Sequence, residues 1–133
     1  MSNVKAKIRI NDEFEGQLDL GSYKVEIAPN RALPYDLLQA ALAGCLHSTF
    51  LDVLEKEELS INFVEYNISG VKRDSVPKML EEVTIKATID TSKSETKVKA
   101  ALELACRYCS IFQTLAKVAK MELIVEFESF GTC

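Results

Sequence analysis

The stretch Pro34–Lys56 constrains the fold most, because apolar residues occupy nearly the whole circumference of the helix that it predicts. Pro34 stands where that helix would begin, and Asp36 in its first turn suits the positive end of the helix dipole. A helix that is apolar all round is usually buried. A small sheet covers only one side of it, so other helices or a second subunit must cover the rest.

The first thirty residues predict three short strands, because apolar side chains alternate there with charged or polar ones. The alternating segments are residues 4–10, 14–20 and 23–27. Turn-forming residues separate them, Asn11 with Asp12 at the first turn and Gly21 with Ser22 at the second. The pattern is typical of an antiparallel meander with one face toward solvent.

The rest of the chain predicts two longer strands, two helical stretches and a last strand. We expect the strands at residues 61–72, 79–89 and 121–127, and the helical stretches at residues 94–109 and 111–119. The predicted order is therefore β-β-β-α-β-β-α-α-β, an α+β fold. At 133 residues the chain fits a single domain, residues 1–133.

Composition excludes several classes of function. With 47% hydrophobic and 27% charged residues, the chain has the usage of a soluble globular protein. A net charge of −4 argues against a nucleic-acid partner, which requires a basic face. The longest apolar run, residues 37–50, is interrupted by polar residues and falls short of the roughly 18 expected of a membrane span. The first ten residues do not resemble a signal peptide, so we expect a cytoplasmic protein without a membrane partner.

Cysteines are the candidate chemical groups, because in a reducing cytoplasm they remain thiols unless redox chemistry or a metal uses them. The chain has four, Cys45, Cys106, Cys109 and Cys133. Cys45 in its apolar helix would be an inert packing residue unless a cation or a hydrogen-bond donor reaches it.

The only histidine, His47, points away from Cys45 on the helix and is expected to be structural. Cys106 and Cys109 form a CxxC motif, which predicts a redox pair or half of a metal site. A zinc site would also need Cys45 and His47, which face different ways, so we predict no metal.

Two segments resemble signatures of the OsmC/Ohr superfamily, which comprises osmotically induced and organic hydroperoxide resistance proteins. Residues 33–45, LPYDLLQAALAGC, resemble its Pro-x-(Glu/Asp)-Leu-Leu-x-Ala-x-x-x-x-Cys helix. Residues 109–115, CSIFQTL, resemble its Cys-Pro-(Val/Ile)-x-x-x-Leu signature, with Ser110 in the proline position. The resemblance covers essentially the whole chain.

The resemblance implies sheets wrapped around two central helices and an intertwined homodimer with active sites at the interface. In the peroxidase members the first cysteine attacks an organic hydroperoxide and the second resolves it. Carried to this sequence, Cys45 is the peroxidatic thiol and Cys109 the resolving thiol. Such a cycle requires a dithiol reductant but no cofactor.

The resemblance also implies supporting groups, because the family pairs its reactive thiolate with an arginine held by a glutamate. The glutamate position is Tyr35 here, followed by Asp36. The early turn that would supply the arginine is acidic, at residues 11–13, so Arg31 and Arg9 are candidate substitutes. The supporting candidates are therefore Arg31, Asp36 and Tyr35.

Two functions follow from these features. The first is a thiol peroxidase that reduces organic hydroperoxides through a Cys45/Cys109 dithiol–disulfide cycle. The alternative is a non-catalytic protein of the same fold that holds a small apolar or thiol-reactive ligand at the dimer interface. The pKa of Cys45 discriminates between them, because peroxidase chemistry requires a value well below the free-thiol reference of about 8.5.

Overall fold

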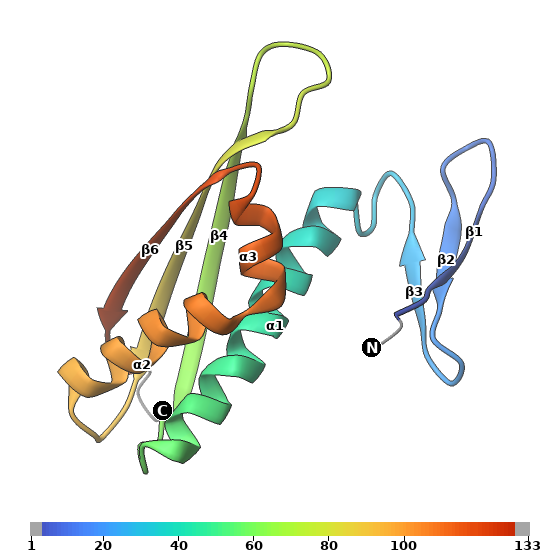
Figure 1. The fold of residues 1–133 in the computed structure, drawn as a ribbon. Helices are drawn as coiled ribbons and strands as arrows, with labels where there is room; N and C mark the ends of the chain where they lie inside the picture. The colour runs from blue at the N-terminus through green and yellow to red at the C-terminus, as the bar shows by residue number, and fades with distance from the viewer. Residues whose placement is uncertain (1–3, 130–133) are drawn as a thin grey trace. The chain divides into compact units, whose positions relative to one another are not determined.

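The computed structural model describes residues 4–129, and their elements follow the order β-β-β-α-β-β-α-α-β (Figure 1). This confirms the predicted α+β class and order of elements. The elements form two compact units, divided after Ala40, which are described in turn.

The N-terminal unit contains an antiparallel sheet in the order β1-β2-β3, as predicted. Each strand has four residues and is shorter than its alternating segment; the strands are β1 (Lys7–Ile10), β2 (Gly16–Asp19) and β3 (Lys24–Ile27). The Asn11 side chain closes the first turn by accepting hydrogen bonds from the backbone N–H groups of Glu13 and Glu15, both at 2.9 Å. Within residues 4–40 only Ile27 is buried, so this unit has little core of its own.

Helix α1 (Pro34–Lys56) begins and ends where the sequence predicts. Its buried residues form one stripe, which consists of Leu42, Leu46, Phe50, Val53 and Leu54. The single chain thus buries one face of α1 and not the whole circumference. By length and composition alone α1 could cross a membrane, which corrects the sequence-based conclusion that its apolar run is too short. A core helix of a soluble protein meets the same criteria.

The C-terminal unit is built on a second sheet, in the order β4-β5-β6. Its strands are β4 (Phe63–Lys72), β5 (Leu80–Asp90) and β6 (Lys120–Phe127). β4 and β5 pair antiparallel, whereas β5 and β6 pair parallel, because two helices connect them. The predicted alternation in β5 is confirmed, since its inward residues are buried: Val83, Ile85, Ala87 and Ile89.

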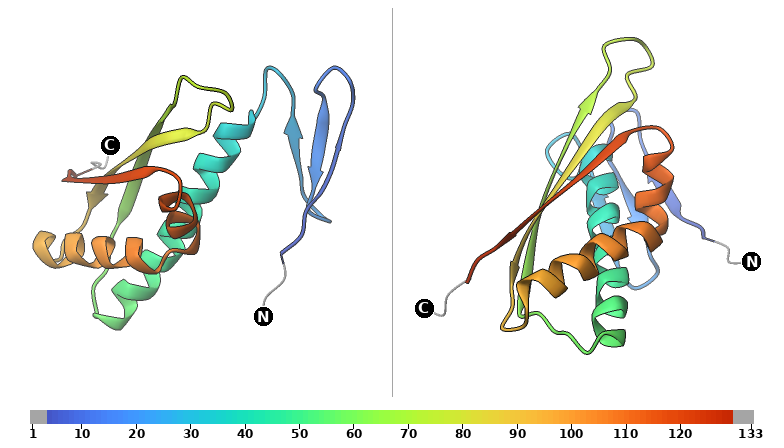
Figure 2. Two further views of the ribbon diagram at one scale, coloured as in Figure 1. Left: turned by 45° about the horizontal axis from the view of Figure 1, so that its top comes forward. Right: turned by 60° about the vertical axis from the view of Figure 1, so that its left-hand side comes forward.

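The two connecting helices are α2 (Glu95–Tyr108) and α3 (Ser110–Ala116). The Ser94 side chain caps α2 by accepting a hydrogen bond from the backbone N–H of Lys97. With α1, these helices lie on one face of the second sheet (Figure 2). The core of the unit lies between them, where apolar residues of α1, β5 and α2 form one cluster. The start of α3 also faces this part of α1, and both candidate thiols lie there.

Candidate active site

Cys45 lies in the middle of α1 and is only partly buried, so that small molecules can reach its thiol. Its Sγ is 3.7 Å from the Ser110 Oγ at the start of α3, within hydrogen-bond range for sulfur. The Cys109 thiol lies near enough to the Cys45 sulfur for each to affect the pKa of the other. The structure therefore brings together the two thiols that the sequence selected, from positions far apart in the chain.

Cys109 is fully buried and separates the two helices. Its extended backbone, with φ −73° and ψ 117°, ends α2 and begins α3. Its Sγ accepts a hydrogen bond from the backbone N–H of Phe112 at 3.4 Å, and so caps α3. The break at Cys109 thus directs this thiol toward Cys45.

The two thiols have different acidities. Burial acts to raise the pKa of Cys45, but hydrogen bonds from the Ile111 backbone, the Cys109 thiol and Ser110 outweigh it and lower that pKa. Burial raises the pKa of Cys109, which holds its proton against the neighbouring Cys45 sulfur. Cys45 is therefore the better nucleophile and Cys109 the thiol that stays protonated, an asymmetry that suits an attacking and a resolving cysteine.

Cys106, the other cysteine of the CxxC motif, is buried within α2. Burial, followed by the charges of Cys109 and Glu103, raises the pKa of its thiol to about 12. It is thus a neutral packing residue at physiological pH. Cys133 lies outside the described residues.

His47 contacts the sheet. Its Nδ1 is 2.9 Å from the Tyr66 hydroxyl on β4, and the two rings meet edge to face at 5.6 Å. Burial lowers the pKa of His47, so the imidazole is neutral at pH 7. The pair links α1 to β4, in agreement with a structural role.

The three supporting candidates lie in the N-terminal unit. The Arg31 guanidinium pairs with the Glu26 carboxylate at 3.4 Å, and both side chains are more than half exposed. The Asp36 carboxylate accepts a hydrogen bond from the backbone N–H of Leu33 at 3.0 Å, and Tyr35 is the second residue of α1. Their role beside the thiols stays a prediction.

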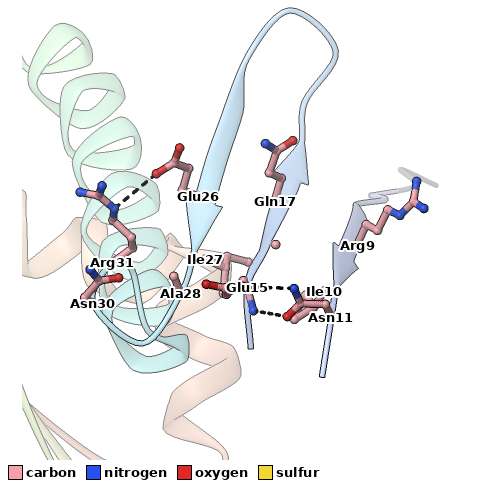
Figure 3. A pocket seen from close by; sticks show the side chains of 11 residues that line it. Arg9, Ile10, Asn11, Glu15, Gln17, Glu26, Ile27, Ala28, Asn30 and Arg31 are labelled. Atoms are coloured by element: carbon pink, nitrogen blue, oxygen red, sulfur yellow. Dashed lines mark hydrogen bonds and ion pairs between the residues drawn. The ribbon is translucent and has the colours of Figure 1, made fainter. Parts of the chain in front are cut away.

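The N-terminal unit also holds an open pocket of about 770 Å³, which the sequence did not predict (Figure 3). Its lining combines Arg9 and Arg31 with Glu15 and Glu26. The Asn11 amide donates a hydrogen bond to the Glu15 carboxylate at 3.2 Å, and Arg31 pairs with Glu26 elsewhere in the lining. Both signs of charge are present, so the pocket has no strong preference for an anion or a cation.

Sequence reasoning missed the contact between Ser110 and the Cys45 thiol. The signal was present, because serine stands where the family signature has proline, and only serine offers a hydroxyl and a backbone N–H. Among residues 4–129, no group of three or more His, Cys, Asp or Glu side chains is arranged to hold a metal. The described site is a pair of thiols with hydrogen-bond donors of Ser110 and Ile111 beside Cys45.

Comparisons with known proteins give the same fold. The family model described as OsmC-like protein matches residues 28–124. An OsmC-like protein from Mycoplasma pneumoniae superposes with a TM-score of 0.85 at 18% identity, covering 95% of this chain and 97% of its own. A hypothetical protein from Aquifex aeolicus VF5 gives 0.84 at 17% identity, covering 98% of this chain and 100% of its own.

A third solved structure, the organic hydroperoxide resistance protein OhrB of Bacillus subtilis, gives a TM-score of 0.70 at 18% identity, covering 92% of this chain and 98% of its own. A search of curated proteins returns no significant match. At these identities the solved structures establish the fold alone.

Proposed function

The chain belongs to the family of OsmC-like proteins, and from this premise we propose that it is a cysteine-based thiol peroxidase that reduces organic hydroperoxides. The observation that carries the proposal is that Cys45 lies beside the start of α3, with its Sγ 3.7 Å from the Ser110 Oγ, so that the thiols of Cys45 and Cys109 are near each other. The similarity to a structure named as an organic hydroperoxide resistance protein supports the choice of substrate.

The two thiols suffice for the chemistry. The Cys45 thiolate attacks one peroxide oxygen, the O–O bond breaks, and the leaving alkoxide takes a proton and departs as an alcohol. Cys45 is then a sulfenic acid. Cys109 attacks its sulfur, a disulfide forms, and the Cys109 proton leaves with the hydroxyl group as water. A dithiol reductant restores both thiols by exchange and becomes a disulfide itself, so the cycle needs no cofactor.

The first prediction concerns the product. Excess cumene hydroperoxide should convert the reduced protein to a form with an intrachain Cys45–Cys109 disulfide, because these two thiols lie near each other. Peptide mapping by mass spectrometry measures it. Cys106→Ser is the matched control and should give the same disulfide, since Cys106 packs within α2. Free thiols at both Cys45 and Cys109 after treatment would refute the peroxidase.

We also propose that the chain acts as a single domain in a homodimer, located in the cytoplasm. Burial supports the dimer, because only 22% of the most apolar 18-residue window of α1 is buried within the chain. Each unit also has exposed apolar side chains, among them Leu51 on α1 and Ile8, Leu20 and Tyr23 in the N-terminal unit. Exposed apolar surface of this extent is typical of a protein interface.

Sedimentation equilibrium tests the homodimer. We expect a mass of about twice the 14.8 kDa of the chain at micromolar concentration, because the apolar face of α1 requires a cover. A single species at the monomer mass would contradict it.

A non-catalytic ligand-binding protein is the second candidate. It is favoured by the N-terminal unit, where Tyr35 stands in the glutamate position of the family and Arg31 already pairs with Glu26. It would hold a small apolar or thiol-reactive ligand at the dimer interface. The disulfide experiment separates the two functions, since a binding protein would keep both thiols free.

A further inference from the structure

We propose that Ser110 holds Cys45 in its reactive thiolate form, through its side-chain hydroxyl and its backbone N–H. The assignment rests on the proposed peroxidase function, for which it identifies the activating residue. It places uncharged activating donors within the α1–α3 contact of the C-terminal unit.

The geometry carries the assignment. The Ser110 Oγ is 3.7 Å from the Cys45 Sγ. In the neutral thiol either atom could donate, but a thiolate can only accept, so ionisation fixes the hydroxyl as the donor. Ser110 is the first residue of α3, where the backbone N–H has no acceptor within its own helix. The Ser110 backbone N–H acts in the same direction as the hydroxyl, since it also lowers the pKa of the Cys45 thiol.

The neighbouring groups agree with uncharged activation. The interactions that lower the pKa of Cys45 come from the Ile111 backbone, the Cys109 thiol and Ser110, none of which carries a charge. Within the C-terminal unit, Cys109 is the titratable side chain that affects the pKa of Cys45, and Cys106 from α2 and Tyr66 from β4 interact in turn with Cys109. These three groups are uncharged when protonated. Hydrogen bonds, and not charges on these groups, therefore stabilise the Cys45 thiolate.

Ser110 also differs from Cys109 because it keeps its hydrogen-bond donor throughout the dithiol–disulfide cycle. The Cys109 donor is lost when that thiol reacts to form the disulfide, whereas the Ser110 hydroxyl remains. When a reductant attacks the sulfur of Cys109, Cys45 leaves as a thiolate beside Ser110. A leaving thiol of lower pKa departs faster. Ser110 thus assists both the attack on peroxide and the reductive step.

Two substitutions separate the two donors. Ser110→Ala removes the hydroxyl and keeps the N–H, whereas Ser110→Pro removes both. The fold should tolerate proline, because the first position of a helix favours it and the extended backbone of Cys109 suits a residue before proline. Thr114→Val is the matched control, since it deletes a hydroxyl of the same helix that bonds to the Ser110 carbonyl.

The measurement is the alkylation rate of Cys45 by iodoacetamide against pH, resolved by mass spectrometry in the full-length protein. Below the midpoint of the wild-type curve we expect a rate about threefold lower for Ser110→Ala and about tenfold lower for Ser110→Pro, with both midpoints moved to higher pH. Thr114→Val should follow the wild type. Circular dichroism verifies folding, and if Ser110→Pro does not fold, Ser110→Ala decides alone.

The inference would be overturned if Ser110→Ala and a folded Ser110→Pro gave the same curve of alkylation rate against pH as the wild type. It would also be overturned if Thr114→Val moved the midpoint of that curve as far as the Ser110 variants do. The assay contains no peroxide, so it is independent of the proposed function. The Ser110 substitutions could shift the alkylation curve while Cys45 and Cys109 stay free thiols after treatment with hydroperoxide. That pair of results would support the role of Ser110 and refute the peroxidase function.

Discussion

Cys45→Ser should reduce the turnover of organic hydroperoxide to background, a loss of about a thousandfold or more. The reason is that a serine hydroxyl does not ionise near neutral pH and cannot replace the thiolate as a nucleophile toward an O–O bond. Coupled consumption of a dithiol reductant measures it. The variant should keep the fold, because residue 45 is only partly buried and serine is close to cysteine in size.

Cys109→Ser should give a different result, because it retains the attacking thiol and loses the resolving one. We expect one equivalent of alcohol per chain, after which the protein stops as a Cys45 sulfenic acid. Trapping with dimedone and mass spectrometry detects that species. Cys106→Ser is again the control and should turn over normally; loss of turnover there, with the fold intact, would transfer the resolving role to Cys106.

Much of the fold could be predicted because its signals are local. Alternation with a period of two marks β5, whose inward residues are buried, and Pro34 marks the start of α1. The predicted boundary between α2 and α3 was less accurate. The expected helical stretches, residues 94–109 and 111–119, became α2 and α3, with Cys109 as an extended residue between them. Its cap uses a thiol, which sequence rules for serine, threonine and aspartate do not include.

The site was only partly predictable because its contacts are not local. The family signatures selected Cys45 and Cys109, but no pattern in the sequence gives the approach of α1 to the start of α3. The approach follows from packing of apolar residues in the core between α1, β5 and α2. The donors from Ser110 and Ile111 belong to the same contact. Residue type alone therefore predicted an inert, buried Cys45, whereas its neighbours lower the pKa of its thiol.

The same packing predicts the largest effect on stability. Phe50 is fully buried on α1, one turn after His47, and its ring meets the His47 ring at 6.2 Å. Phe50→Ala should lower the free energy of unfolding by about 3–5 kcal/mol, because it removes apolar contacts and leaves a cavity. Urea unfolding monitored by circular dichroism, at one fixed protein concentration, measures the change.

Leu51→Ala provides the control, because Leu51 is the next residue of α1 and its side chain is 46% exposed within the chain. In a monomer this substitution should change the free energy of unfolding by less than about 0.5 kcal/mol. A cost at Leu51 that grows with protein concentration would show that a second chain covers this face of α1, since assembly adds to stability by mass action. If both substitutions lowered the free energy of unfolding equally, at every protein concentration, the division of α1 into a buried and an exposed face would be contradicted.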